Sequence, residues 1–478
     1  MGRHLAMFRR RRQADPLESA LLHWSKKDAF VVRDLVRSVF IGGQTGSGKS
    51  SGSGKALMRA IVGHPNTGGL FIASKPEDKD DIERIFSGAG RSGDLYVIEP
   101  AGEYRCNILD EELKNGADTR QLTQCMVTIQ ETLGRASGDG QDPFWKEQNR
   151  RQIFNAIEIV KAATGRCDPW DVQRFIGGAA STVEEMADAA WRGGFHARLS
   201  RAAYGRSKSA IEQHDCELAT QYWTGEIPRL NDRTRSSINA GVMGLLHVFN
   251  TGVVRDLIAS TTNLSPSVMA DRKWILVNMP IVAGDASATV VNCGIKYVVQ
   301  RQILRRKASP DGATLVIWCD EFQKVANSYD AAFLAECRSH LGCMVVLTQS
   351  IHSMYESVGG RAGQHQANAL MTNFGHKIIH TLGDSESAEY FSSLLGKRLE
   401  AMPGGSDGGY KGMGDELFGD GGFRGSFSQN YQPVLQPGVF LSGLRSGGAG
   451  KAVDGIVIRT GEPFSTGDNY LRVAFKQE

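Results

Sequence analysis

The sequence has no long hydrophobic run and no paired cysteines. Its longest apolar stretches, such as residues 315–319 and 343–347, fall far short of the ~18 residues that a membrane span needs, and no apolar segment follows the basic start. We therefore expect neither a membrane span nor a signal peptide. The eight cysteines form no C-x-x-C pair and no metal-type spacing. They indicate reduced thiols, as in a cytoplasmic protein.

Acidic residues are absent from the first twelve positions, where five arginines stand. Removing these five charges from the formal net charge of +3 leaves −2 for the rest of the chain. A generally basic nucleic-acid-binding surface is therefore excluded, so that any DNA contact has to come from a local patch or from a ring of subunits that concentrates charge in a pore. The arginine run at 9–12 is either a contact for anionic lipid or nucleic acid or, as we favour, a solvated terminus.

A phosphate-binding loop is the clearest motif. The apolar residues 39–41 lead into Gly-Gln-Thr-Gly-Ser-Gly-Lys-Ser at 43–50, which matches G-x-x-x-x-G-K-S. The glycines let backbone N–H groups turn toward one point, the following helix adds its positive N-terminal end, Lys49 reaches the β- and γ-phosphates, and the Ser50 hydroxyl ligates magnesium. We therefore predict ATP and Mg2+ as cofactors. The predicted nucleotide-binding residues are Gly43, Thr45, Gly46, Ser47, Gly48, Lys49, Ser50 and Ser51.

A second Gly-Ser-Gly-Lys at 52–55 is a decoy. Lys49 stands where its leading glycine should be, and Ala56 replaces the magnesium hydroxyl. The alternative for the first copy is a glycine-rich linker that matches by chance. The strand-like run before it and the apolar Leu57 and Ile61 after it favour the phosphate loop.

Two carboxylates follow a second apolar run. The phosphate loop has no acidic residue of its own to hold magnesium or to polarise water, and these two side chains can supply it. Residues 314–319 read as a buried strand that ends in Asp320 and Glu321. We predict that Asp320 holds magnesium through water and that Glu321 polarises the attacking water. Apolar runs before Asp-Glu also occur by chance, but the pairing with a phosphate loop favours the functional interpretation.

The roles of two further residues cannot be decided from their spacing alone. Gln349 follows the strand at 343–347, where it is either a sensor of the γ-phosphate or an ordinary turn residue. Arg338 is either a surface residue or an arginine finger that enters a neighbour's active site.

The alternation of strands and helices predicts an α/β fold. Strand-like runs at 69–73 and 95–98 flank a helical segment, and sheet character resumes at 274–279. Between them, apolar residues recur at three and four positions, which indicates helices. We predict a parallel-sheet P-loop NTPase domain at 30–109 and 263–478, an inserted all-α domain at 110–262, and a basic lead-in at 1–29.

The ends of the chain carry weaker signals. Residues 13–37 read as an amphipathic lead-in followed by a strand at 30–32, which we expect at an edge of the nucleotide domain. The segment 402–426 holds ten glycines and predicts a flexible linker or, as the alternative, a moving pore or lid element. Alternating strands are expected at 434–435, 438–441 and 452–458.

Several motifs together resemble one family, the coupling ATPases of conjugative DNA transfer and type IV secretion, within the wider group of hexameric DNA-pumping motors. They occur in the family's order over roughly 30–460. The motifs are Gly-Gln-Thr-Gly-Ser-Gly-Lys-Ser at 43–50, Ala-Ser-Lys-Pro at 73–76, Asp-Pro-Phe-Trp at 142–145, Thr-Arg-Ser-Ser-Ile at 234–238, Trp-Cys-Asp-Glu-Phe at 318–322, Arg-Ser-His-Leu-Gly at 338–342, Thr-Gln-Ser at 348–350 and Asn-Phe-Gly-His-Lys-Ile at 373–378.

The resemblance implies a RecA-like motor domain interrupted by an all-α domain. It also implies a homo-hexameric ring with ATP at the subunit boundaries and single- or double-stranded DNA in the central channel. It favours Arg338 as a finger that acts in trans, which can supply ~10³–10⁵ in rate. The catalytic residues expected are thus Lys49, Glu321, Arg338 and Gln349, with Ser50 and Asp320 at the metal.

One departure from the family is that its members usually begin with a two-span membrane anchor, whereas this chain starts with its arginines. We expect either a partner that anchors it at the inner membrane or a relative with another DNA-handling task. The leading hypothesis is an ATP-driven motor that delivers DNA, with an attached relaxase-type protein, to a conjugation or secretion apparatus. The alternatives are a secretion ATPase that acts on protein components without nucleic acid, and a nucleotide-switched cargo adaptor.

Overall fold

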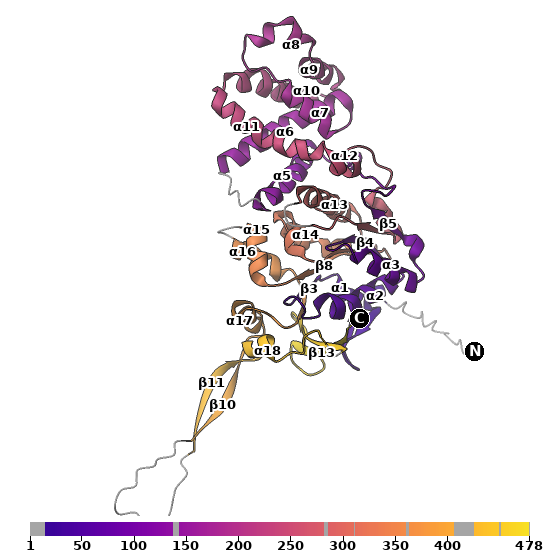
Figure 1. Cartoon of the computed structure of the whole chain (residues 1–478), viewed down its shortest axis with the longest axis vertical. Coiled ribbons are helices and arrows are strands. Elements are labelled where there is room, and N and C mark those ends of the chain that lie inside the picture. The colour runs from indigo at the N-terminus through magenta and orange to yellow at the C-terminus, as the bar shows by residue number, and fades with distance from the viewer. Residues whose placement is uncertain are drawn as a thin grey trace, which may run out of the picture.

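A nine-stranded sheet forms the centre of the molecule in the computed structural model, which describes residues 15–136, 143–281, 285–309, 311–359, 363–405, 425–448 and 451–477 (Figure 1). Its strand order is β13-β12-β9-β3-β8-β7-β4-β6-β5, in which β12 pairs antiparallel with both β9 and β13 and all other neighbours are parallel. The strands are β3 (Val39–Gly42), β4 (Thr67–Ile72), β5 (Leu95–Ile98), β6 (Trp274–Val277), β7 (Thr314–Cys319), β8 (Gly342–Thr348), β9 (His376–Ile379), β12 (Ala452–Arg459) and β13 (Tyr470–Lys476).

The central strands are apolar along their whole length because both faces of the sheet are covered. All positions of β3, β4, β7 and β8 are buried. One apolar core lies against α2 (Lys55–Gly63) and α3 (Asp78–Gly88). The core on the other face contains side chains of α13 (Ala286–Arg305), α14 (Ser328–Glu336), α15 (Ile351–Gly359), α16 (Gly363–Thr372) and α17 (Ser385–Leu394).

Helices alone connect β5 to β6 in the part of that connection that the structure describes. They stack at one end of the molecule in Figure 1. They are α4 (Ile108–Lys114), α5 (Thr119–Ala136), α6 (Pro143–Thr164), α7 (Pro169–Gly177), α8 (Ala189–Gly193), α9 (Phe195–Arg206), α10 (Ala210–Gln221), α11 (Asp232–Phe249) and α12 (Gly252–Ile258). The predicted α/β class with an inserted all-α region is confirmed, while the boundaries 1–29, 30–109, 110–262 and 263–478 stay a prediction.

Helix α13 joins the two regions. A Cβ atom at its Gly294 would lie 2.9 Å from Cδ1 of Ile108 and 3.4 Å from Cδ1 of Ile258, so the glycine allows α4 and α12 to approach closely. Apolar side chains of the helical region and of the sheet's second face therefore form one continuous core.

No single helix in the described ranges combines the length and apolarity needed to cross a membrane. The bent pair α11–α12 meets both requirements together, by length and composition only. The eight cysteines are all free and buried.

The N-terminal strand prediction is only partly right. β1 (Ala20–His23) and β2 (Ala29–Val31) form a separate two-stranded sheet, followed by the short helix α1 (Val32–Leu35). The predicted edge position is wrong, because Trp24 and Phe30 fold onto the face of the large sheet and join its first core. The arginine run at 9–12 and Asp142 lie outside the described residues.

The C-terminal predictions also need correction. Residues 438–441 lie in the helix α18 (Pro437–Ser442), because Pro437 fits the first position of a helix and the short apolar run carries no strand-specific period. Strand β12 is as predicted and pairs with β9. Both flanks of the glycine-rich segment are strands rather than a linker: β10 (Lys397–Gly405) pairs with β11 (Gly425–Pro433), while 406–424 lie outside the described residues. This ribbon extends away from the sheet in Figure 1.

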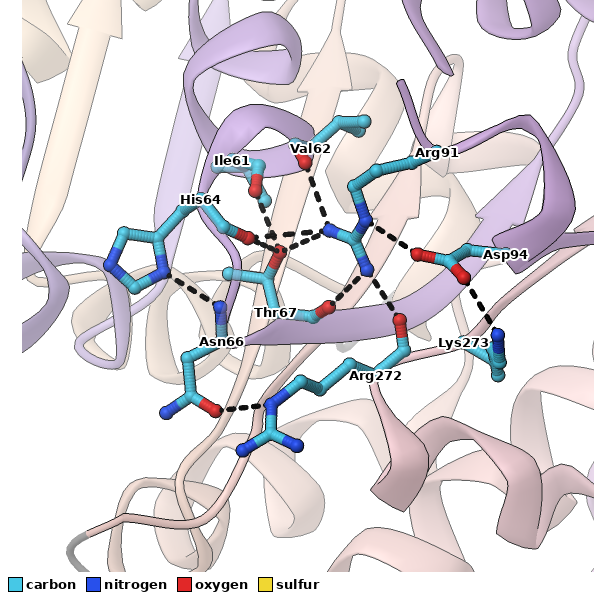
Figure 2. Close-up of polar contacts among 9 residues, drawn as sticks. All are labelled: Ile61, Val62, His64, Asn66, Thr67, Arg91, Asp94, Arg272 and Lys273. Carbon is cyan, nitrogen blue, oxygen red and sulfur yellow. Dashed lines mark hydrogen bonds and ion pairs between the residues drawn. The ribbon is translucent and has the colours of Figure 1, made fainter. Parts of the chain in front are cut away.

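A polar network locks α2 to the sheet at the edge where the parallel strands begin (Figure 2). The Arg91 guanidinium donates to the carbonyl oxygens of Val62 at 2.9 Å and Thr67 at 3.0 Å, and to Asp94 Oδ2 at 2.8 Å. It also donates to the carbonyl oxygen of Arg272, just before β6. One side chain thereby joins the end of α2 to the starts of β4 and β6, far from the opposite edge where the phosphate loop lies.

Candidate functional site

The phosphate loop follows β3 at the carboxyl edge of the sheet. Gly46 and Gly48 have φ angles of 77° and 88°, which favour glycine. A Cβ atom at Gly43 would lie 2.5 Å from the Ser47 hydroxyl. A six-residue π-helical segment, Lys49–Gly54, then leads into α2. The loop thus has the close backbone turn that the sequence predicts.

The two predicted magnesium residues are in direct contact. The Ser50 hydroxyl donates a 2.8 Å hydrogen bond to Oδ2 of Asp320, which follows β7. Burial raises the pKa of the Asp320 carboxyl, while the bonds from Ser50 and from the backbone N–H of Glu321 oppose that rise. A partly buried carboxylate beside a hydroxyl offers the oxygen ligands that Mg2+ prefers, so these two residues fit the ion.

Lys49 and Glu321 form the second contact across the loop. Nζ of Lys49 lies 3.7 Å from Oε1 of Glu321, with side chains only 8% and 10% exposed. Glu321 has a φ of 47°, in the left-handed region that non-glycine residues seldom adopt. Such backbone strain is typical of residues at functional sites.

Gln349 completes this cluster from the next strand. It follows β8, which pairs with both β3 and β7, and its Nε2 donates a 3.0 Å hydrogen bond to Oε2 of Glu321. Gln323, which the sequence did not single out, donates to the same oxygen at 2.5 Å and accepts from Thr348 Oγ1 at 2.9 Å. Its only sequence signal is an amide two residues after the Asp-Glu pair.

The rest of the loop is partly buried. Ser47 is fully buried and its hydroxyl has no hydrogen-bond partner in the described structure. Thr45 and Gly46 are exposed, and the Gly46 carbonyl accepts from the backbone N–H of Gly447 at 3.0 Å. Ser51 Oγ accepts from Gln477 at 3.1 Å. The C-terminal segment therefore touches the loop, a contact that no motif in the sequence indicates.

His380 supports the loop helix from the end of β9. Its Nε2 lies 2.7 Å from the Ser53 hydroxyl, and its Nδ1 lies 2.8 Å from the Asp454 carbonyl oxygen, to which only an N–H can donate. Burial lowers the pKa of His380 to about 4. The ring is therefore neutral, with its proton on Nδ1, and Nε2 accepts from Ser53.

Arg338 is the one predicted catalytic residue that does not join its own chain's cluster. It is exposed in the 3-10 turn Cys337–His340, which precedes β8, whereas Gln349 follows β8. Arg306 holds this turn by donating to the carbonyl oxygens of His340 at 2.8 Å and Leu341 at 2.9 Å. The two ends of one strand thus separate Arg338 from Gln349.

Comparison with known proteins agrees with the nucleotide-binding fold described above. Residues 314–435 match a family model described as the TraM recognition site of TraD and TraG. The fold matches the bacterial conjugative coupling protein TrwBdeltaN70 in an unbound form, with a TM-score of 0.60 and 13% identity over 96% of this chain and 88% of that chain. The resemblance to the coupling protein family is confirmed.

Further coupling-protein structures share the fold. Plasmid coupling protein TrwB in complex with the non-hydrolysable GTP analogue GDPNP matches with a TM-score of 0.59 and 14% identity over 96% of this chain and 89% of that one. TrwB in complex with ADP and Mg2+ matches with a TM-score of 0.59 and 13% identity, covering 94% and 87%. At such identities the likeness shows the fold, here the RecA-like P-loop NTPase fold. No curated protein sequence matches this chain.

Proposed function

We propose that this chain is an ATP-hydrolysing motor of the coupling-protein class. The observation that carries the proposal is the convergence of Lys49 and Ser50 with Asp320, Glu321 and Gln349 at one edge of the sheet. A lysine and a hydroxyl on a phosphate loop, opposite two carboxylates and an amide, are the groups that phosphoryl transfer to water requires. The coupling-protein structures that hold nucleotide support this assignment.

Each side chain of the cluster has its own role in this proposal. Lys49 and the loop N–H groups bind the β- and γ-phosphates of ATP, and Ser50 with Asp320 would hold Mg2+. When bound, the ion neutralises phosphate charge. Glu321 accepts a hydrogen bond from the attacking water and orients it, while Gln349 and Gln323 hold Oε2 of that carboxylate. Gln349 also reports the presence of the γ-phosphate.

The working form in this proposal is a homo-hexamer with ATP between subunits. Arg338 is exposed and lies at the opposite end of β8 from the site of its own chain, a position that suits a finger for a neighbour. The ring would enclose DNA and carry it, with bound relaxase-type protein, to a conjugation or secretion apparatus. The segment that matches a TraM recognition site supports a conjugation partner. A cytoplasmic location, held at the inner membrane through a partner, belongs to the same proposal.

Mass measurement of the purified chain in ATP, with and without single- or double-stranded DNA, tests ring and ligand together. We expect a hexamer and DNA-stimulated hydrolysis, with DNA affinity that falls steeply as salt rises. Hydrolysis without any DNA binding at low salt would overturn the DNA part. Stimulation by protein components alone would select the protein-directed secretion ATPase instead.

A further inference from the structure

A fully buried ion pair lies behind the turn that carries Glu321. Lys296 of α13 and Asp330 of α14 are both 0% exposed, and Nζ of Lys296 donates to the two Asp330 carboxylate oxygens at 2.8 and 2.7 Å. The same ammonium donates to the Val325 carbonyl oxygen at 2.6 Å. Its three N–H groups are thus all used inside the protein.

The Asp330 carboxylate collects two more hydrogen bonds. Oδ1 accepts from Nε2 of Gln300 at 2.7 Å, and Oδ2 accepts from the backbone N–H of Asn327 at 2.8 Å. Helix α13 therefore holds the segment between Val325 and Asp330 at both ends. The lysine and the glutamine stand one helical turn apart on α13.

The held segment leads directly to Glu321. The Glu321 carbonyl oxygen accepts from the backbone N–H of Lys324 at 2.9 Å, and the Phe322 carbonyl oxygen accepts from those of Val325 and Ala326. Residues 321–326 are therefore one hydrogen-bonded turn, and Lys296 is bonded to its far end. The ring of the fully buried Phe322 also lies 5.2 Å from Nζ of Lys296.

We propose that Lys296 and Asp330 are positioning residues that hold Glu321 in its left-handed conformation beside Lys49 and Gln349. A strained backbone persists only where its surroundings hold it, and the ion pair is the polar part of those surroundings. A buried pair adds little stability over well-packed apolar side chains, so what it supplies here is geometry. The inference rests on the proposed ATPase function, since it concerns the residue that orients water.

The test is the double variant Lys296→Met/Asp330→Asn, which leaves no buried charge unpaired and keeps an oxygen for the Asn327 N–H. We expect kcat for ATP to fall about 10-fold or more while the Kd for a fluorescent ATP analogue in Mg2+ changes less than about 3-fold. In a Glu321→Gln background the double substitution should lower residual single-turnover hydrolysis no further, because the pair acts through Glu321.

The matched control is Glu112→Gln/Arg305→Met. It removes a bidentate pair, at 2.9 and 2.6 Å, between α4 and the same helix α13 without touching residues 321–326. Its kcat should stay within about 3-fold of the wild type. If the double variant does not fold, Gln300→Met carries the test: it removes one hydrogen bond to Asp330 and keeps the ion pair, and we expect a smaller fall in kcat at unchanged Kd.

The outcomes separate this inference from the proposed function. A wild-type chain that binds but does not hydrolyse ATP overturns the function itself. An active wild type whose variant keeps full kcat, or loses kcat and nucleotide affinity together with thermal stability, overturns the positioning role alone. An equal loss of kcat in the Glu112/Arg305 control would also overturn it.

Discussion

Nε2 of Gln349 and Nε2 of Gln323 both donate to one carboxylate oxygen of Glu321, Oε2. The other oxygen, Oε1, lies 3.7 Å from Nζ of Lys49. The two amides therefore fix which oxygen faces the phosphate loop. Because the neighbouring strands β3, β8 and β7 are parallel and end at the same edge of the sheet, one carboxylate thus connects the loop after β3 with the turns after β7 and β8.

Glu321→Gln should stop turnover and keep ATP binding. The amide retains the shape of the side chain but loses the proton-accepting charge, so we expect kcat to fall by about 10²–10⁴ with little change in nucleotide Kd. Steady-state phosphate release and binding of a fluorescent ATP analogue measure the two quantities. A variant with near-normal turnover would remove Glu321 from the mechanism. In a nucleotide-switched adaptor, the biological output would survive this change.

Arg338→Ala should lose activity in a way that another subunit can restore. If Arg338 acts on a neighbour, the kcat of the variant falls by about 10³-fold or more. A Lys49→Ala subunit is inactive but keeps Arg338, so mixing it with the Arg338→Ala chain should give more hydrolysis than either alone. Phosphate release across a series of mixing ratios measures this complementation.

Lys307→Ala is the matched control for the finger. Lys307 is exposed and directly follows Arg306, which binds the turn that carries Arg338. Its loss should leave kcat unchanged. Mixed rings that stay inactive would show that Arg338 does not act between subunits, even if the single variant is slow.

The core of the site was predictable because its residues obey a simple rule of parallel sheets. Ser50 and Asp320 are separated by 270 positions, yet Ser50 closes the loop that follows one apolar strand and Asp320 directly follows another, and parallel strands end at a common edge. Gln349 could be placed by the same rule. The role of Arg338 could not be decided in this way, because its relation to another copy of the chain is not encoded in strand order.

The contacts of His380 and the helix α18 could not be predicted from the sequence, because they depend on antiparallel strand pairing and on chain reversals. His380 reaches the phosphate loop helix through Ser53, and the Asp454 carbonyl on β12 fixes its tautomer. No local sequence pattern predicts that β12 lies beside β9. The run at 438–441 predicts a strand but lies in the helix α18, because a four-residue run has no usable period.

Stability should fall as the pH drops below neutrality, and His380 should account for part of that fall. Burial lowers its folded-state pKa to about 4, whereas an unfolded histidine titrates near 6.5. Between about pH 6.5 and 4 the unfolded chain therefore binds a proton that the folded chain does not, which costs roughly 1.4 kcal/mol per pH unit. The stability that the neutral His380 contributes is therefore fully present above about pH 6.5 and is lost progressively as the pH falls toward 4.

Urea unfolding at several pH values, with wild type and His380→Gln, measures this effect. The glutamine does not titrate, so the slope of unfolding free energy against pH should decrease by about one proton. Ser53→Ala is the control, because it removes a partner of the ring and keeps the imidazole. An unchanged slope in His380→Gln would show that the histidine is not the buried neutral group described above.

Arg91→Met should destabilise the fold without affecting nucleotide binding. The side chain is only 11% exposed, and its hydrogen bonds to Val62, Thr67 and Arg272 satisfy carbonyl oxygens at the end of α2 and the start of two strands (Figure 2). Leaving such groups without partners costs about 1–3 kcal/mol each, so we expect a loss of roughly 3 kcal/mol in unfolding free energy.

The same arginine lies at the sheet edge opposite the phosphate loop, so the ATP affinity of the folded variant should stay unchanged. Arg84→Ala is the matched control: its side chain is 73% exposed and pairs with Asp81 at the surface, where an ion pair contributes about 0–1 kcal/mol. Urea unfolding compares the two variants, and a fluorescent ATP analogue measures binding in both. Equal stability of the two would mean that the Arg91 network does not fasten α2 to the sheet, whereas a loss of nucleotide affinity would mean that the network extends its effect along α2 to Lys49.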